Sequence, residues 1–289
     1  MTRIFSLVMF AGTFLSLSLL GCQQQEAASP ANGIVEANQA YLKNFGEPPV
    51  VSKGRGFARV GFLPLSRDPE RVRAIPFYLF DERDQLRQLL ERLTGREIIL
   101  APDSPLYQPF PGDLQLKVGT VENGTVTLML STQETPTGTD LSAMAVALTE
   151  TSVQFPEIER VRILVNGQPL AQMPAEGFSH MPKHLAPVEP PLMVMIAGMW
   201  EPGAEAPEEI LVDFDRPVTV NRFNLFDASG KKVEGKYFTS AFDMAVVVHP
   251  EDPKAFQEGT MLRAEWDVTD ALGRSNAGAN SLPLRRYEH

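Results

Sequence analysis

The chain has 289 residues, 43% of them hydrophobic and 21% charged, and its formal net charge at pH 7 is −10. Such proportions are normal for globular domains, and the length suggests two of them. An acidic chain without a basic patch is a poor candidate for binding nucleic acid or anionic headgroups, so we expect no nucleic-acid partner.

Residues 1–21 have the pattern of a secretory signal, because Arg3 is the only charge ahead of an apolar run over residues 4–20. The run ends in Leu19-Leu20-Gly21-Cys22, which resembles the lipobox of bacterial lipoproteins. The resemblance implies lipid addition to the Cys22 thiol and cleavage after Gly21. An uncleaved membrane anchor remains an alternative, since about 20 apolar residues span a bilayer. An ordinary signal peptide cut elsewhere is another.

Cys22 is the only cysteine of the chain, so an intrachain disulfide is excluded and stability must come from core packing. One acyl chain anchors a protein only marginally, and the two chains of a diacylglyceryl group would hold it stably. We therefore expect a membrane-anchored lipoprotein of the cell envelope with its folded part outside the cytoplasm. Gln23, rather than Asp, after the cysteine resembles the pattern that permits transfer to an outer membrane, if the host has one.

A lipidated tether is expected over residues 22–55. Its first part, residues 23–30, is polar and has little to bury. The stretch from Ile34 to Phe45 predicts one amphipathic helical piece, which Pro48, Pro49 and Gly54 end.

An α+β domain is predicted over residues 56–174. Its expected elements are strands over 57–65, 71–80, 114–118, 125–130 and 161–165, and helices over 81–94 and 140–154. Leucines at three- and four-residue spacing indicate the first helix, and Asp140 is the expected N-cap of the second. Asn123-Gly124 between alternating runs predicts a tight hairpin. This order is typical of an α+β sandwich with helices on one sheet face.

The segment from Leu114 to Leu170 resembles the GerMN domain of sporulation and germination proteins. The matching motifs are Pro111-Gly112, Glu122-Asn123-Gly124-Thr125-Val126-Thr127-Leu128, Val146-Ala147-Leu148-Thr149-Glu150-Thr151 and the run from Phe155 to Gly167. The helix over residues 81–95 fits an earlier helix of that domain, although Gly95 is followed by Arg96 and not by proline. The resemblance implies a non-enzymatic domain with a fold similar to ring-building motifs, which assembles with an envelope protein or with itself.

A Pro-rich connector is expected over residues 175–189, and an all-β domain over residues 190–289. Strand-like runs lie at 192–196, 210–214, 222–226, 233–238, 244–248, 262–268 and 282–284, with turn residues between them. This spacing predicts a β-sandwich. Two short segments, 208–217 and 268–273, resemble bacterial Ig-like domains, which serve as spacers or adhesive modules.

Histidines and methionines near the connector are the candidates for metal binding. His180 and His184 flank Pro182, which favours an extended chain, and their imidazoles would then lie roughly 12 Å apart at about 3.1 Å per residue. With Met181, Met193, Met195 and Met199 nearby, a copper carrier is an alternative reading. We expect instead that Met193 and Met195 alternate into the sandwich core, and we assign no metal site.

The acidic residues do not indicate a metal site either. Asp213 and Asp215 flank an inward Phe214 and could bind calcium with Asp270, but the loop spacing for calcium is absent and a solvated strand face is expected. Glu205, Glu208 and Glu209 are interpreted as an exposed loop.

No catalytic fingerprint occurs in the sequence, so we assign no catalytic residue and no cofactor. We expect a lipid-anchored protein-interaction or scaffold module that is not an enzyme, with an envelope protein or a second copy as partner. A periplasmic copper or small-ligand carrier is the alternative, and an envelope-polymer hydrolase is the third possibility.

Overall fold

The computed structural model describes residues 33–95, 98, 100, 104–170 and 172–287, all of which belong to one compact unit. The expected signal sequence and Cys22 lie outside the described residues. In the part that is described, no helix combines the length and the apolar character needed to cross a membrane.

Part of the expected tether is folded. Residues 34–45 form strand β1 (Ile34–Ala37), which pairs in parallel with β2, and helix α1 (Gln39–Phe45). The Asn38 side chain caps α1 by accepting a hydrogen bond from the Tyr41 N–H at 2.9 Å. Tyr41 and Phe45 lie in the core with 0% and 3% of their surface exposed. The segment is therefore a strand and a short helix that contribute to the core, and the expectation of one helical piece in a free tether is corrected.

Two sheets build the α+β domain. The first has the order β1-β2-β3, with β2 (Arg55–Leu65) and β3 (Asp68–Leu79) forming an antiparallel hairpin. The second contains β4 (Gln115–Glu122), β5 (Thr125–Ser131), β6 (Arg160–Val165) and β7 (Gln168–Pro169) in that order. A short strand, β8 (Phe178–Ser179), also pairs with β6.

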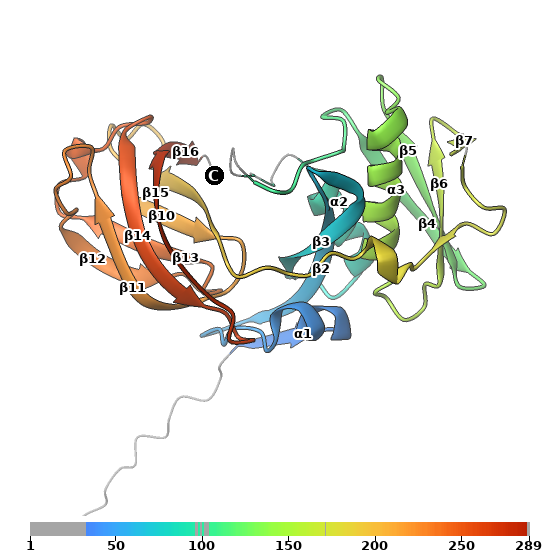
Figure 1. Ribbon diagram of the computed structural model, residues 1–289, viewed down its shortest axis with the longest axis horizontal. Helices are drawn as coiled ribbons and strands as arrows, with labels where there is room; N and C mark the ends of the chain where they lie inside the picture. Colours follow the sequence, from blue (N-terminus) through green and yellow to red (C-terminus); the bar gives the residue numbers. More distant parts are fainter. Residues whose placement is uncertain (1–32, 96–97, 99, 101–103, 171, 288–289) are drawn as a thin grey trace, which may run out of the picture. The chain divides into compact units, whose positions relative to one another are not determined.

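Helices α2 and α3 lie between these two sheets. Helix α2 (Gln85–Thr94) contacts β2, β3 and β4, and helix α3 (Gly138–Ser152) contacts β2, β3 and β6. Figure 1 shows α3 between the β2–β3 hairpin and the β5–β6 pair. The α+β class is confirmed, but the helices cover two sheets and not one face of a single sheet. This is why the C-terminal half of α3 is buried on every side.

Local signals located the elements well and their ends less well. The hairpin at Asn123-Gly124 is confirmed, with φ of 48° and 75° at the two residues. Helix α3 begins at Gly138 after Thr137 as its N-cap, so Asp140 lies in the first turn and is not the cap. Helix α2 begins four residues later than expected because Asp84 adopts a left-handed conformation with φ of 50°.

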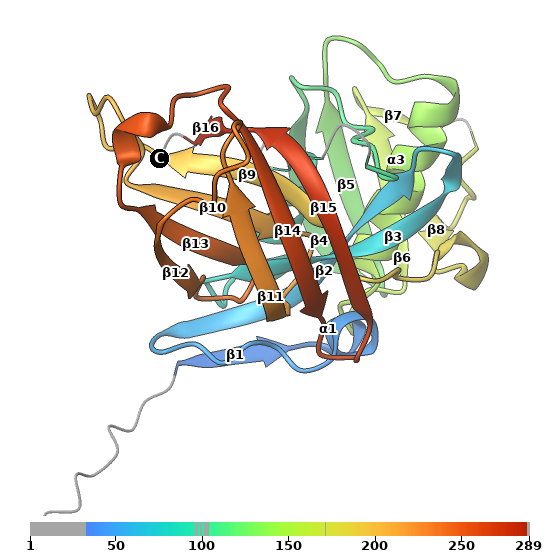
Figure 2. The ribbon, with the colours of Figure 1, turned by 60° about the vertical axis from the view of Figure 1, so that its left-hand side comes forward.

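The C-terminal residues form a β-sandwich of two sheets. One sheet has the order β12-β13-β10-β9-β16 and the other has the order β11-β14-β15. Their bounds are β9 (Met193–Met199), β10 (Glu209–Phe214), β11 (Thr219–Phe226), β12 (Gly235–Thr239), β13 (Ala245–Pro250), β14 (Met261–Thr269), β15 (Ser275–Pro283) and β16 (Arg285–Tyr287). Figure 2 shows β11, β14 and β15 in front of β9, β10 and β13. Side chains from both sheets, including Ile196, Val212, Phe214 and Trp266, form the core between them.

Candidate functional site

Four consecutive polar residues are buried at the C-terminal end of α3. Thr149, Glu150, Thr151 and Ser152 are each 3% exposed or less. The Thr151 hydroxyl accepts a hydrogen bond from the Phe62 N–H at 3.0 Å, and the Ser152 hydroxyl donates to the Leu148 carbonyl at 2.8 Å. The Thr149 hydroxyl has no partner among the described residues. Because a buried polar group without a partner costs free energy, Thr149 marks this end of the helix as unusual.

The carboxylate of Glu150 contacts polar groups of the segment that follows β8. Its carboxylate lies 2.6 Å from Nδ1 of His180, accepts a hydrogen bond from the Met181 N–H at 3.0 Å, and lies 3.8 Å from Nδ1 of His184. A 3-10 turn, η1 (Pro182–His184), bends the chain back here. The expectation of an extended chain with imidazoles about 12 Å apart is therefore wrong, because both rings face the same carboxylate.

Burial affects the ionisation of His184, the more enclosed of the two histidines. Burial lowers the pKa of His184 from its usual 6.5, and the nearby Glu150 carboxylate only partly offsets that effect. The neutral form of His184 is therefore favoured. The side chain of His180 is the more exposed of the two, at 47%. Hydrogen bonds of Glu150 with the His180 ring and with the Met181 N–H hold the segment that leads into η1.

The candidate copper ligands lie on two different elements, with His180, Met181 and His184 at or just before η1 and Met193, Met195 and Met199 on β9. Among the described residues, no group of three or more His, Cys, Asp or Glu side chains could hold a metal ion. Met193 is in the sandwich core, as expected, but Met195 is only partly buried, because the register of β9 shifts where Asp213 and Phe214 pair with it. Met181 is 42% exposed near the other end of the connector.

A cavity of about 700 Å³ lies beside α3 in the α+β domain. Leu141, Ala145 and Thr149 of the helix line one side, and Phe178 and Met181 line another. Its dimensions fall in the range of 300 to 1,000 Å³ that is typical of small-molecule sites. Met181 and His184, from the segment held by Glu150, also line the cavity, whereas the hydroxyl of Thr149 is itself buried.

A second hollow, of about 680 Å³, lies next to β4. Its apolar lining comes from Leu86, Val118, Val121 and Phe155, and its acidic residues are Glu82, Asp84 and Glu157. Strand β4 lies at one edge of its sheet, so on its outer side it has no neighbouring strand in the described part of the chain. An open strand edge beside an apolar hollow is a surface that an extended peptide can extend by hydrogen bonding.

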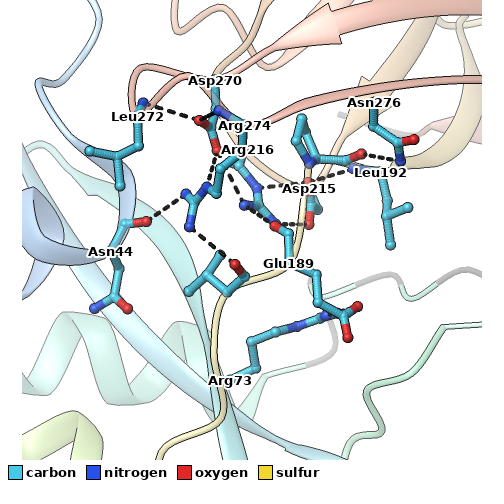
Figure 3. A network of polar contacts seen from close by, with 12 residues as sticks. Asn44, Arg73, Glu189, Leu192, Asp215, Arg216, Asp270, Leu272, Arg274 and Asn276 are labelled. Atoms are coloured by element: carbon cyan, nitrogen blue, oxygen red, sulfur yellow. Dashed lines mark hydrogen bonds and ion pairs between the residues drawn. The ribbon is translucent and has the colours of Figure 1, made fainter.

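The acidic residues of the sandwich are not a solvated face or a calcium site. Asp215 and Asp270 both pair with the buried guanidinium of Arg216, at 2.6 Å and 3.4 Å (Figure 3). Asp270 also accepts hydrogen bonds from Arg274 Nε at 2.6 Å and from the Leu272 N–H at 3.0 Å. Asp213 lies apart from this network, and burial raises its pKa to about 6. The carboxylates of Asp215 and Asp270 are thus occupied by cations of the chain itself.

The same network holds the connector in place. Arg216 donates to the Glu189 carbonyl at 2.6 Å, while the Glu189 carboxylate pairs with Arg73 at 2.8 Å. Arg274 donates to the Asn44 carbonyl at 2.7 Å (Figure 3). These groups stabilise the fold. Of the three glutamates interpreted as an exposed loop, Glu209 instead begins β10 and lies 3.0 Å from His249, whereas Glu205 and Glu208 are exposed.

The architecture defines a two-domain protein. An α+β domain with helices between two sheets is followed by a β-sandwich. Residues 62–171 match the model of the Germane family, which is described as sporulation and spore germination. The chain therefore carries a GerMN-like domain, and the remainder is rich in β-structure, in keeping with an Ig-like sandwich.

Several solved structures are similar to part of the chain. The first GerMN domain of the sporulation protein GerM from Bacillus subtilis is 24% identical, with 43% of this chain and 93% of that chain covered and a TM-score of 0.34. The tandem GerMN domains of the same protein are 18% identical over 62% of this chain and 58% of that chain, with a TM-score of 0.33. CopC from Methylosinus trichosporium OB3b is 14% identical over 33% of this chain and 89% of that chain, with a TM-score of 0.23. No curated protein matches the sequence.

Sequence reasoning missed the part played by Thr149 and Glu150, although both stand in the motif that resembles the GerMN domain. The available signal was a run of four polar residues at the end of a helix that otherwise lacks a clear polar face. A polar run in a helix that packs on two sides must either find partners or face a cavity.

Proposed function

We propose that the protein is a lipid-anchored component of the cell envelope that binds a protein partner through its GerMN-like domain and has no enzymatic activity. The N-terminal pattern ending in Gly21-Cys22 supports the anchor, and the match of residues 62–171 to a sporulation and germination family supports an assembly role. The sandwich then acts as a spacer or as a second contact.

The open edge of β4 is the observation that carries the interaction. A partner segment that adds a strand to this edge would form backbone hydrogen bonds and place an apolar side chain in the adjoining hollow. Val121, which is 39% exposed, lies at the end of β4 and lines that hollow. The hollow is lined by three acidic side chains and by one basic side chain, Arg87, so it favours a partner segment that carries basic residues.

Site-specific crosslinking in intact cells tests this surface. A photo-reactive amino acid in place of Val121 should yield a discrete adduct with a protein, which mass spectrometry then assigns to a partner or to a second copy. The matched control places the same group at Met261, which is 45% exposed on β14 of the sandwich. Failure to obtain an adduct at position 121, or the same products from both positions, would contradict the β4 assignment.

The anchor is tested separately. Cells that express the chain should incorporate labelled palmitate into it, and Cys22→Ala should abolish the label. The same variant should be released from the membrane fraction. Label that persists in Cys22→Ala, or parent protein that takes up no label, would remove the anchor from the proposal and leave the β4 surface to its own test.

A further inference from the structure

The chain that continues toward the N-terminus leaves the folded part at a defined place. The Gly33 N–H donates to the Val51 carbonyl at 2.8 Å, and the Ile34 N–H donates to the Gly54 carbonyl at 2.9 Å. A Cβ on Gly33 would come within 2.6 Å of the Val51 side chain, so the two segments pack closely. The start of β1 and the loop over residues 46–54 are therefore held together around the exit of the chain.

Two large apolar side chains beside this exit are exposed to solvent. Val50 is 78% exposed, the highest value for a large apolar side chain in the described part of the chain, and Ile34 is 60% exposed. The fold buries their neighbours instead, since Val51 is 7% exposed and Val35 packs against the core. Single exposed apolar residues are common on protein surfaces. Two at the exit of the chain form a small apolar surface that is open to a partner.

The charges near these side chains are nearly balanced, although the chain has a formal net charge of −10. The loop before β2 has one acid, Glu47, and one base, Lys53, and both are exposed. Two further acids, Glu36 and Glu82, pair with Arg55 at 2.6 Å and 3.0 Å. An anionic membrane surface repels an acidic protein as a whole, but it would meet little net charge at this place.

A lipid bilayer is the partner that the position of this surface favours. Only eleven peptide links separate Cys22 from Gly33, so a lipid on Cys22 would keep the surface next to the membrane. Tethering raises the effective concentration of the two partners, and a contact too weak to hold a free protein is then populated. Exposed aliphatic side chains gain free energy when they enter the boundary between headgroups and acyl chains.

We propose that Ile34, Val50 and Lys53 form an exit surface that lies on the bilayer to which Cys22 is anchored. The two aliphatic side chains enter the boundary region, while the ammonium of Lys53 reaches the headgroups at the end of its apolar stem. The proposal rests on the lipid anchor proposed above and adds a non-covalent contact with the same membrane. This contact orients the folded part, because the end of the α+β domain that carries Val50 faces the lipid.

Tryptophan quenching by brominated phosphatidylcholine tests this contact. The chain from Cys22 onward, which contains all of the described residues, is coupled through its only thiol to a maleimide phospholipid in phosphatidylcholine vesicles. The result then does not depend on lipid addition in the cell. The native tryptophans, Trp200 and Trp266, are 8% and 4% exposed, so the brominated lipid should leave most of their emission unchanged.

Two variants place a new tryptophan on the exit surface. Relative to vesicles of unbrominated lipid, brominated vesicles should reduce the added emission of Val50→Trp by roughly half, because the indole would lie at the membrane boundary. Ile34→Trp should behave in the same way. Met261→Trp is the matched control, since Met261 is 45% exposed on β14 of the sandwich, and it should show no more quenching than the parent.

A charge on the exit surface tests whether the contact is apolar. Ile34→Asp, combined with Val50→Trp, should lower the quenching at least about threefold, because a carboxylate is costly in the apolar region. Met261→Asp in the same chain should leave the quenching unchanged. High salt should also leave it unchanged, since screening weakens contacts between charges and not contacts between apolar groups.

Equal quenching of Val50→Trp and Met261→Trp, or no quenching of Val50→Trp beyond that of the parent, would overturn the exit surface. Loss of quenching at high salt would show that charges, and not the aliphatic side chains, make the contact. Each variant should unfold at the parent temperature, because the replaced side chains are exposed. If Ile34→Asp unfolds earlier, the comparison of Ile34→Trp with Met261→Trp decides in its place.

Failure of the anchor and failure of the exit surface are distinguishable. Palmitate labelling in cells tests the anchor on Cys22 alone, whereas the quenching measurement uses a chemical link to the lipid. A chain that takes up no palmitate but passes the quenching test loses the anchor and keeps an apolar surface with affinity for lipid. A chain that takes up palmitate but shows no quenching at position 50 keeps the anchor and loses the proposed contact.

Discussion

The guanidinium of Arg216 lies 3.4 Å from the carboxylate of Asp270, and the two side chains are 2% and 1% exposed. Arg216 also pairs with Asp215 at 2.6 Å, so one cation serves two carboxylates that the sequence suggested as calcium ligands. A buried charge is tolerated only when its partners remain. The group is therefore a structural support at the start of the sandwich, and its removal should affect stability before it affects binding.

Arg216→Met should destabilise the protein by about 3–5 kcal/mol, because it leaves Asp215 and Asp270 without their central cation. Urea unfolding at pH 7.5, followed by tryptophan fluorescence, measures the change. Arg222→Met is the matched control, since Arg222 is exposed on β11, and it should change stability by less than about 0.5 kcal/mol. Equal midpoints for the two variants would show that the buried group contributes little.

Asp213 should make the protein less stable as the pH rises. Burial raises its pKa from 3.8 to about 6, so the folded state binds the proton more tightly than the unfolded state does. Stability from this group is present below about pH 4 and is lost between about pH 4 and 6. Asp213→Asn should thus be more stable than the parent at pH 7.5, by on the order of 2 kcal/mol, and similar to it at pH 4.

Thermal unfolding at the two pH values checks this difference. Asp252→Asn, an exposed change just before η2 (Pro253–Ala255), should behave as the parent at both. If Asp213→Asn gave the same shift at pH 4 as at pH 7.5, ionisation would not be its cause.

Glu150→Ala should destabilise the α+β domain by about 1–3 kcal/mol, because it leaves the Met181 N–H and the His180 ring without their acceptor. Glu150→Gln keeps an acceptor and should lose less. Hydrogen exchange at residues 178–185 should become faster in the alanine variant. Glu176→Ala, an exposed change near the same cavity, should leave exchange there as in the parent.

Residues before Gly54 should be needed for a stable fold. Tyr41→Ala removes a side chain that is fully buried and hydrogen-bonded to Tyr78 at 2.7 Å, and it should cost about 3–5 kcal/mol. Lys43→Ala, on the exposed side of the same helix, should cost little. A fragment that begins at Gly54 should unfold at a lower temperature than one that begins at Gly33. Fragments of equal stability would show that α1 is dispensable.

Alternating and periodic patterns were sufficient to predict most elements of both domains. They failed where an element depends on a distant partner. Strand β15 is made of small and polar residues with low strand propensity, yet it pairs along its whole length with β14. Gly278 lies under Trp266, where a Cβ would come within 2.9 Å of the ring. Only the position of Trp266 in the folded sandwich explains the glycine, and no local signal contains it.

The candidate sites were predicted less well for the same reason. The spacing of His180 and His184 suggested distance, but a buried carboxylate from α3, Glu150, draws both rings to one place. The pairing of Asp215 and Asp270 with Arg216 joins residues up to 54 positions apart in the chain. Sequence can name such residues as polar and unusual, whereas their partners depend on the tertiary fold.

Because β1 and α1 belong to the core, only a short stretch of chain separates Cys22 from the folded part. This stretch limits how far the folded part of an anchored molecule can lie from the membrane. From Cys22 to Gly33 the chain has eleven peptide links, which reach at most roughly 40 Å, whereas a free leash up to residue 55 would reach about three times as far. If Cys22 carries a lipid, Gly33 would then lie no farther than this distance from the membrane surface. A partner would then have to lie close to the same membrane, because the short linker limits how far the folded part can extend from the bilayer.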